Sequence, residues 1–192
     1  GGPPTSSSPR RHFTVYSEAT LRLSHLKLTQ GRVITSSNLV SAYGGSIYVY
    51  GKNAVLKARS ILFAGCGGNN CARYGGAVSA RSAARVTLTD STFHGCRATY
   101  HGGACYISHS GTTMSVVNTA FINNRAIEKK GGGIFAGSGE ISLLGGRNEF
   151  VGNQAYCNSR GHSIYRHKSV KLFYDVCRPG TFQDESTTIK KY

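Results

Sequence analysis

One stretch of the chain decides the fold: residues Arg85 to Ser108 read RVTLTDSTFHGCRATYHGGACYIS. Val86 and Leu88 alternate with threonines, which is typical of a strand that buries one face. Phe93 then precedes a His-Gly turn and Cys96, and a glycine pair leads into a second alternating segment, ACYIS. The stretch therefore predicts short strands that are joined by tight corners, with no room for a helix between them.

Two motifs from this stretch recur along the chain at a common period. A glycine-led strand begins five times, at intervals of 31, 27, 29 and 30 residues: GGSI from Gly44, GGAV from Gly75, GGAC from Gly102, GGGI from Gly131 and GHSI from Gly161. Between these strands runs a second motif, with phenylalanine three residues before cysteine or asparagine: Phe63 to Cys66, Phe93 to Cys96, Phe121 to Asn124 and Phe150 to Asn153. A shared period indicates a repeat architecture. Short strands without a helix predict an all-β, right-handed parallel β-helix, in which each strand pairs with its equivalent one coil away.

Equivalent residues of stacked coils should form columns. The inward column of the glycine-led strand is expected to contain Ile47, Val78, Cys105, Ile134 and Ile164. The column of the phenylalanine motif is expected to contain Leu26, Phe63, Phe93, Phe121 and Phe150, and to end at Val176. Leu21–Leu28 and Val170–Val176 then form atypical terminal coils that cap the core. We expect five to six coils within residues 12–180, a basic Pro/Ser-rich arm over residues 1–11 and a polar tail over residues 181–192.

The combination of GGA[IV] with FxxN at this spacing resembles the repeats of the chlamydial polymorphic outer membrane proteins and of related β-helix surface proteins of protists and algae. The best-matching segments are Gly75–Val78, Phe121–Asn124 and Phe150–Asn153. The resemblance runs from Leu21 to Cys177, but His162 replaces the second glycine of its motif, and Cys66 and Cys96 replace asparagine. It implies a right-handed β-helix of the pectin-lyase-like type, a non-enzymatic adhesion function, and a location outside the cell or at its surface. An organellar complex is the alternative location.

The charge of the chain is strongly unbalanced, with 23 Lys and Arg against 8 Asp and Glu and a formal net charge of +15. A field of this sign attracts acidic partners, so we expect acidic protein subunits or an acidic polysaccharide, with nucleic acid as the alternative. Basicity that serves only solubility is the competing interpretation. No apolar run approaches the roughly 20 residues of a membrane-spanning helix, so we expect no membrane span, while peripheral contact with an anionic membrane stays open.

The outward side of the glycine-led strand is the candidate contact surface. An aromatic ladder flanked by cations can stack on sugar rings, on bases or on another protein, and an exposed apolar strip usually marks a contact. The candidate residues are Tyr48, Tyr50, Arg81, Tyr106, Phe135, Tyr165 and His167. A corner column beside them contains Tyr43, Tyr74, His101, Lys130 and Arg160. In the competing interpretation, aromatic stacks between adjacent strands only stabilise the solenoid. The candidate tail contacts are Arg10, Arg11, Lys190 and Lys191.

The distribution of acidic residues argues against carboxylate-based catalysis. Glycoside hydrolysis requires two carboxyl groups about 5–10 Å apart, and the expected register puts no two body acids in one outward column of neighbouring coils. The acidic residues are Glu18, Asp90, Glu128, Glu140, Glu149, Asp175, Asp184 and Glu185. We also expect no metal site and no cofactor, because the only dense set of potential zinc ligands should diverge: His94, Cys96, His101 and Cys105.

The six cysteines are an even number, which is compatible with an oxidising compartment without proving one. Cys66 and Cys96 occupy equivalent corners of adjacent coils, so they are candidates for either a disulfide or a stacked pair of reduced thiols. Cys157 and Cys177 are candidates for a second disulfide.

These observations predict a non-enzymatic β-helix that acts as a rigid binding or scaffold module, either as a subunit of a larger assembly or as a surface adhesion protein. A basic, nucleic-acid-associated subunit of a ribonucleoprotein is the first alternative, and steeply salt-dependent RNA binding would indicate it. A lyase or hydrolase acting on polyuronate is the second alternative, and turnover of pectate would indicate that.

Overall fold

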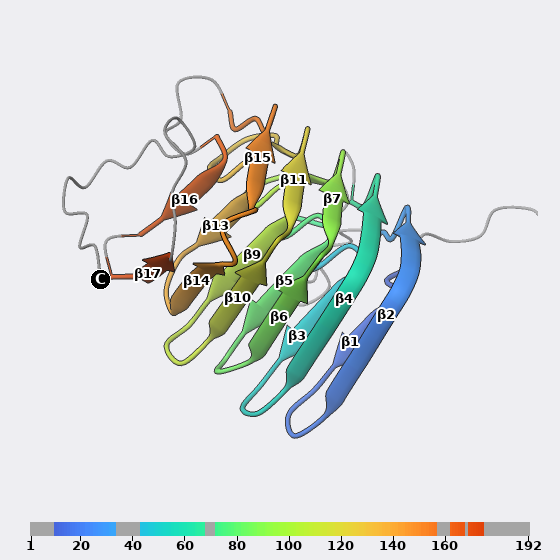
Figure 1. The fold of residues 1–192 in the computed structure, drawn as a ribbon, viewed down its shortest axis with the longest axis vertical. Coiled ribbons are helices and arrows are strands. Elements are labelled where there is room, and N and C mark those ends of the chain that lie inside the picture. The colour runs from blue at the N-terminus through green and yellow to red at the C-terminus, as the bar shows by residue number, and fades with distance from the viewer. Residues whose placement is uncertain (1–9, 34–42, 68–71, 157–161, 168, 175–192) are drawn as a thin grey trace, which may run out of the picture.

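The computed structural model describes residues 10–33, 43–67, 72–156, 162–167 and 169–174 of the 192-residue chain. These residues contain strands and turns but no helix, and they wind as a right-handed parallel β-helix of about five turns (Figure 1). The predicted fold class is confirmed. Most of the expected arm and the whole of the expected tail lie outside the described residues.

The strands of successive turns stack into three sheets, and every strand pairing is parallel. The six-stranded sheet contains β1 (Phe13–Val15), β3 (Ile47–Tyr50), β5 (Val78–Arg81), β9 (Cys105–Ser108), β13 (Ile134–Ala136) and β16 (Ile164–Arg166). The nine-stranded sheet contains β2 (Thr20–Thr29), β4 (Val55–Ala64), β6 (Arg85–Thr89), β7 (Thr92–His94), β10 (Thr113–Val117), β11 (Ala120–Ile122), β14 (Glu140–Leu144), β15 (Glu149–Val151) and β17 (Lys171–Tyr174). The two-stranded sheet contains β8 (Arg97–Ala98) and β12 (Arg125–Ala126).

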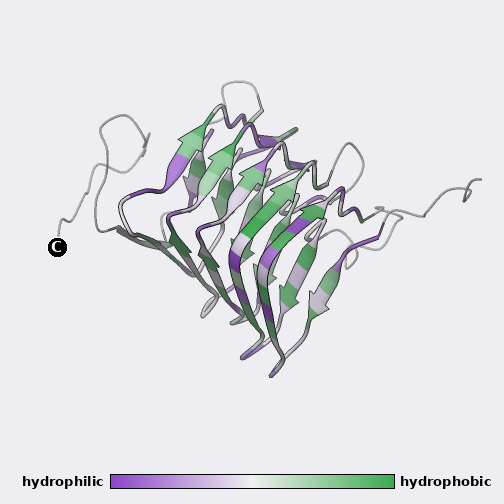
Figure 2. Ribbon diagram, turned by 45° about the vertical axis from the view of Figure 1, so that its right-hand side comes forward, coloured by the Kyte–Doolittle hydropathy of each residue, from purple (hydrophilic) through white to green (hydrophobic). Residues whose placement is uncertain are grey.

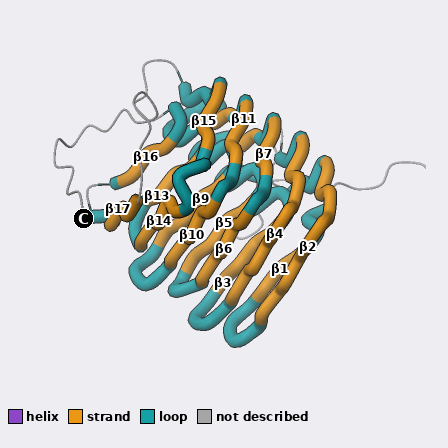
Figure 3. The backbone as a smooth tube through the Cα atoms, viewed as in Figure 1, coloured by secondary structure: helices purple, strands orange, loops and turns teal. Residues whose placement is uncertain are grey.

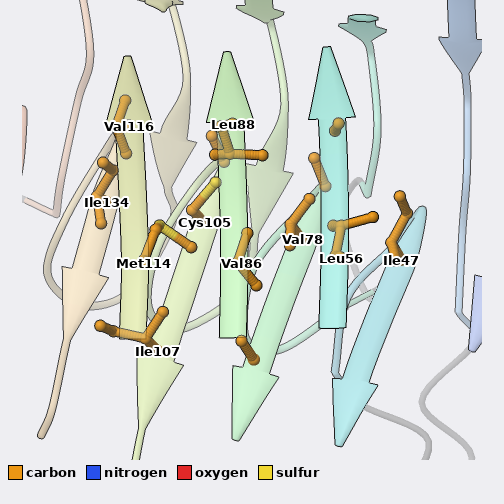
Figure 4. Packing of buried hydrophobic residues seen from close by; sticks show 14 of the residues in the cluster. Ile47, Leu56, Val78, Val86, Leu88, Cys105, Ile107, Met114, Val116 and Ile134 are labelled. Atoms are coloured by element: carbon orange, nitrogen blue, oxygen red, sulfur yellow. The ribbon is translucent and has the colours of Figure 1, made fainter. Parts of the chain in front are cut away.

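The inward residues of the two large sheets form one continuous core. The predicted inward column is in register from turn to turn: Ile47, Val78, Cys105, Ile134 and Ile164. These side chains face those of the opposite sheet, as Figure 4 shows for Val78, Val86 and Leu88. Apolar and hydrophilic residues are interleaved along the strands in Figure 2, which is the alternation that a half-buried strand requires.

The phenylalanine motif contributes one ring per turn to a stack of Phe63, Phe93, Phe121 and Phe150. Successive ring centroids lie 4.4, 4.8 and 4.9 Å apart, with interplanar angles of 7°, 3° and 2°. The prediction that Leu26 is the first member of this column is wrong, because the register pairs Leu28 with Phe63. β2 turns its corner at His25, which has a φ of 54°, so residues 28–31 correspond to the later Phe-x-Gly-Cys segments. The expected last member, Val176, lies outside the described residues.

The corner that leads into the six-stranded sheet requires the glycine pair of the repeat. Gly102 has a φ of 68°, and a Cβ atom there would clash with the Cys105 carbonyl oxygen. A Cβ atom on Gly103 would clash with the carbonyl oxygen of Gly132 in the next turn. His162 departs from the motif in the last described turn, where no later described turn supplies such a carbonyl group.

The cysteine or asparagine of the second motif forms a hydrogen-bonded column inside the adjacent corner. Each side chain donates to a backbone carbonyl oxygen in the preceding turn, that of the residue in the phenylalanine column. The bonds run from Cys66 Sγ to Leu28 O at 3.5 Å, from Cys96 Sγ to Phe63 O at 3.7 Å, from Asn124 Nδ2 to Phe93 O at 3.0 Å and from Asn153 Nδ2 to Phe121 O at 2.8 Å. Both residue types occur at this position because both satisfy the same backbone acceptor.

Candidate functional site

The predicted aromatic residues lie on the outer face of the six-stranded sheet. The register places one residue per turn in the expected column: Tyr48, Ser79, Tyr106, Phe135 and Tyr165. The neighbouring column contains Tyr50, Arg81 and Ser108, and His167 follows β16, where its backbone N–H donates to Ala136 O. The four rings of the first column are termed the aromatic strip: Tyr48, Tyr106, Phe135 and Tyr165. The Phe135 ring centroid lies 5.4 Å from that of Tyr106 and 5.1 Å from that of Tyr165.

The corner column folds onto the aromatic strip. Tyr43 and Tyr74 are bridged in register, and their ring centroids lie 4.9 Å apart. The Tyr43 ring lies 5.5 Å from the Tyr48 ring, and the Tyr74 ring lies 5.0 Å from the Tyr106 ring. Ser79 permits this packing, because its short side chain leaves the strip open between Tyr48 and Tyr106. The Ser79 hydroxyl is buried and has no hydrogen-bond partner among the described residues, which opposes the gain from ring packing.

His101, the third member of the corner column, behaves as an aromatic ring. Its ring centroid lies 4.1 Å from that of Phe135. Burial lowers the pKa of the His101 imidazole to about 4, and the charges of Lys129 and Lys130 act in the same direction. The imidazole is therefore neutral at pH 7. Burial also raises the pKa of the Tyr106 hydroxyl above its usual range.

The aromatic strip and the corner rings of Tyr43, Tyr74 and His101 together form an aromatic cluster, and cations lie over rings at both of its ends. The Arg81 guanidinium carbon is 4.1 Å from the centroid of the Tyr43 ring. At the other end, Lys130 Nζ is 4.3 Å from the centroid of the Tyr165 ring and 3.1 Å from its hydroxyl oxygen. Such cation–π contacts stabilise the packed rings.

Of the predicted tail contacts, Arg11 is bound to the β-helix itself. Arg11 Nε donates to Gly44 O at 2.9 Å, Nη2 donates to Tyr43 O, and the guanidinium carbon lies 5.2 Å from the centroid of the Tyr48 ring. Arg11 therefore helps to hold the first turn against the aromatic cluster. The other predicted tail contacts are Arg10, which is exposed, and Lys190 and Lys191, which lie outside the described residues.

The aromatic strip is more deeply covered than expected. Tyr48 is 4% exposed and Phe135 is 9% exposed, because the corner column and the neighbouring rings cover them. Tyr50, at 40%, and His167 are the exposed members of the predicted set. The expectation of an exposed apolar strip is therefore wrong for Tyr48 and Phe135, and their burial favours a role in stabilising the outer face of the solenoid.

Exposed cations form a second candidate surface, on the outer face of the nine-stranded sheet. Arg22 of β2 pairs in register with Lys57 of β4, and Arg59 follows two residues later on the same face. Arg85 lies on β6, opposite Val55 of β4. These four exposed side chains are termed the cationic face: Arg22, Lys57, Arg59 and Arg85. Arg59 pairs with Asp90, with 3.5 Å between Nε and Oδ2, whereas the other three have no acidic partner among the described residues.

A further pair of like charges lies on the two-stranded sheet. Arg97 and Arg125 are in register on β8 and β12, and both are exposed. Each follows the cysteine or asparagine of the second motif, in the segments CRA and NRA. This recurrence is the sequence signal that could have identified the pair. Arg22 has no comparable signal, because β2 lacks both motifs and its register was not predicted correctly.

Two acidic residues of the nine-stranded sheet, Glu140 and Glu149, lie in columns without a second carboxylate. Glu140 lies opposite Thr113 and Lys171, and Glu149 lies opposite Ala120, so neither has a carboxylate neighbour in its column. In the described ranges, no group of three or more His, Cys, Asp or Glu side chains could hold a metal ion. These columns therefore contain no carboxylate pair of the kind that glycoside hydrolysis uses.

Cys66, Cys96 and Cys105 are buried free thiols. Cys66 also accepts a hydrogen bond from Ser46 Oγ at 2.9 Å. A hydrogen bond with Cys96 lowers the pKa of the Cys66 thiol, whereas burial raises the pKa of Cys96 and of Cys105. Cys66 and Cys96 are therefore not bridged in the structure, and both belong to the hydrogen-bonded column of cysteine and asparagine side chains. The proposed partners Cys157 and Cys177 lie outside the described residues.

Comparison with family models, with curated proteins and with solved structures gives no match. The resemblance to the polymorphic outer membrane protein repeats therefore stays a prediction that rests on the two motifs. Within the described ranges, no helix has the length and apolar character needed to cross a membrane.

Proposed function

We propose that this protein is a non-enzymatic β-helix that serves as a rigid scaffold, in a larger assembly or at a cell surface, and docks an acidic protein or polysaccharide. The observation that carries the proposal is the presence of exposed like-charge neighbours on the outer faces of the solenoid. Arg22 lies opposite Lys57, and Arg97 lies opposite Arg125.

Like charges at these positions favour a bound anion. Adjacent strands lie about 4.8 Å apart, and like charges directly opposite each other destabilise a sheet. Carboxylates of a partner would relieve this repulsion and replace it with attraction. The parallel sheets fix the spacing of the cations, so the surface loses little freedom when a partner binds.

The aromatic cluster supports the scaffold part of the proposal. Tyr106, Phe135 and Tyr165 stack from turn to turn, and the rings of Tyr43 and Tyr74 connect them to Tyr48. Arg11 and Lys130 lie over the rings of Tyr48 and Tyr165, at the two ends. A second stack, of phenylalanines, runs inside the core. Rigidity of this kind suits a module that presents fixed charges.

A binding experiment on the full chain tests the proposal. The immobilised protein is exposed to poly-L-glutamate, polygalacturonate and polyuridylate RNA at increasing NaCl concentrations. We expect binding to at least one of the two carboxylate polymers, with an affinity that falls steeply as salt screens the charges. The double variant Lys57→Glu/Arg85→Glu should weaken this binding by about ten-fold or more. The matched control, Lys129→Glu/Arg147→Glu, makes the same charge change at exposed positions away from the cationic face and should weaken it less.

Three outcomes contradict the proposal. Absence of binding to both carboxylate polymers at low salt removes its basis. A clear preference for the RNA favours the ribonucleoprotein alternative instead. Turnover of polygalacturonate, with or without Ca²⁺, identifies an enzyme.

A further inference from the structure

β2 is a long strand at one end of the stack. It has 10 residues, from Thr20 to Thr29, and among the described residues it pairs only with β4 (Figure 3). A strand in this position presents unpaired backbone N–H and C=O groups along its outer edge. Such an edge is the site at which an extended peptide can add to a sheet.

Three inward leucines of β2, Leu21, Leu23 and Leu26, are incompletely covered, whereas Leu28 is buried. Leu26 is 45% exposed, although its partner in the next turn, Ile61, is 1% exposed. Leu21 and Leu23 are only partly buried, whereas their partners in β4 are fully buried. Among the described residues, the columns of Leu21, Leu23 and Leu26 thus reach the end of the solenoid without a complete layer over their last members. Burial of this apolar surface would favour a further strand.

The outward side of the same edge is cationic. Arg22 and Lys27 alternate with the inward leucines, and both are exposed. Arg10 and Arg32, which a backbone hydrogen bond joins at this end, are also exposed. The acidic residue of this turn, Glu18, accepts hydrogen bonds from Asn53 Nδ2 at 3.2 and 3.3 Å.

We propose that the edge of β2 binds an extended acidic segment of a partner protein, which adds to the nine-stranded sheet as one further strand. The segment places apolar residues over Leu21, Leu23 and Leu26 and acidic residues beside Arg22 and Lys27, and it has one corner residue opposite His25, where the inward and outward alternation of β2 shifts by one residue. This inference rests on the proposed function and specifies both the chemistry of the partner and the place where it binds.

Charge favours this occupant over a second copy of the chain. Each copy has a formal net charge of +15, and the edge itself is lined by cations. Charged residues, lysine above all, are a common protection against pairing between identical edges. The same residues attract a strand of opposite charge, because opposite charges on neighbouring strands stabilise a sheet.

Hydrogen exchange on the full chain, combined with affinity measurements, tests the inference. The probe is the synthetic nonapeptide VEVEGVEVE, in which valine and glutamate alternate on either side of a glycine that faces the His25 corner. The control peptides are the same sequence with lysine in place of glutamate and the block peptide VVVVGEEEE. At a probe concentration of about ten times Kd, amide exchange in β2 should slow by about ten-fold. Exchange in β6, which β4 and β10 already pair on both sides, should not change.

Two charge-reversed variants separate this inference from the general proposal. Arg22→Glu/Lys27→Glu changes the edge, and Lys57→Glu/Arg85→Glu makes the same charge change on interior strands. The edge variant should weaken binding of the alternating probe by about ten-fold, and the interior variant should weaken it by a smaller factor. Each variant is first shown to keep the circular dichroism spectrum and unfolding midpoint of the unaltered chain within error, and Arg22→Gln/Lys27→Gln replaces the edge variant if it does not.

Several results overturn the inference. Equal losses in the two variants, equal binding of the block peptide, or unchanged exchange in β2 would leave the acidic docking surface in place but remove the added strand. Self-association of the unaltered chain at physiological salt, detected by light scattering, would assign the edge to a second copy. Absence of any acidic binding would instead contradict the proposed function itself.

Discussion

Replacement of Asn124 with alanine should strongly destabilise the β-helix. Asn124 is fully buried, and its Oδ1 accepts from Cys96 N at 2.9 Å. Its Nδ2 donates to Phe93 O at 3.0 Å and to Asn153 Oδ1 at 2.9 Å. Alanine leaves the Cys96 N–H without this acceptor and Phe93 O without this donor, whereas Asn153 Oδ1 keeps the bond from Asn124 N at 3.1 Å. A buried group left unsatisfied costs about 1–3 kcal/mol, so the expected loss is about 3 kcal/mol.

The chain itself suggests two matched variants. Asn124→Cys keeps a donor for Phe93 O, as Cys96 provides for Phe63 O one turn earlier, but it supplies a weaker acceptor for Cys96 N. Its loss should therefore be smaller, at about 1–2 kcal/mol. Cys96→Asn places the amide where two later turns already have one, and the free energy of unfolding should change by less than about 1 kcal/mol.

Urea unfolding, followed by far-ultraviolet circular dichroism under reducing conditions, measures these differences. The dependence of the unfolding free energy on urea should be the same in all variants, so that midpoint shifts report stability. A loss below about 1 kcal/mol for Asn124→Ala would refute the reasoning, because the column would then not satisfy otherwise unpaired groups. A loss for Asn124→Cys equal to that for Asn124→Ala would show that cysteine and asparagine are not equivalent donors at this corner.

Three further predictions concern the corners and the stacked rings. Gly103→Ala should destabilise the protein more than Gly65→Ala in thermal unfolding, because a Cβ atom on residue 103 would clash with Gly132 O. A Cβ atom on residue 65 meets open space, so that only the positive φ of 59° costs about 1–2 kcal/mol there. Equal losses of stability in the two variants would contradict the packing argument. The pKa of His101 is about 4 in the folded state and about 6.5 when unfolded, so the unfolded state binds more protons between these values and stability should fall as the pH is lowered through this window. His101→Phe should reduce that fall in urea titrations at several pH values, and an unchanged slope would exclude His101 as its source. Phe93→Ala should cost about 3–5 kcal/mol in the same titrations, and a loss near 1 kcal/mol would mean that the ring stack can collapse into the space.

The core columns of the glycine-led strands were predictable because a recognisable sequence motif precedes each of these strands. The glycine pairs and the Phe-x-x-Cys or Phe-x-x-Asn segments fix the register of β5, β9 and β13 without knowledge of the structure. Neither motif precedes β2. The prediction that Leu26, and not Leu28, pairs with Phe63 therefore shifted the register of the second half of β2 by two residues. Counting residues along β2 does not show that His25 occupies the left-handed corner position, because histidine adopts a positive φ more often than most residues but does not mark such a position as glycine does.

The covering of the aromatic strip could not be predicted from columns alone. A column assigns Tyr43 and Tyr74 to a corner, but it does not say that their rings fold over the small Ser79 onto the neighbouring sheet face. That packing depends on side-chain rotamers and on the free volume above Ser79. The like-charge neighbours Arg22 and Lys57 of the cationic face depend on the register of β2, so their pairing could not be predicted.

The cations at the first turn should affect two binding equilibria in opposite directions, association with a second copy of the chain and association with an acidic segment. The Debye length at physiological ionic strength is about 8 Å, so these charges influence another molecule only when it is almost in contact with the edge. At that distance a second copy brings further cations, whereas an acidic segment brings the missing counter-charges. The exposed leucines favour either encounter, because apolar burial does not depend on sign. In the proposed complex, we therefore expect selectivity to come from Arg22 and Lys27, and much of the affinity to come from the backbone edge and the leucines behind it.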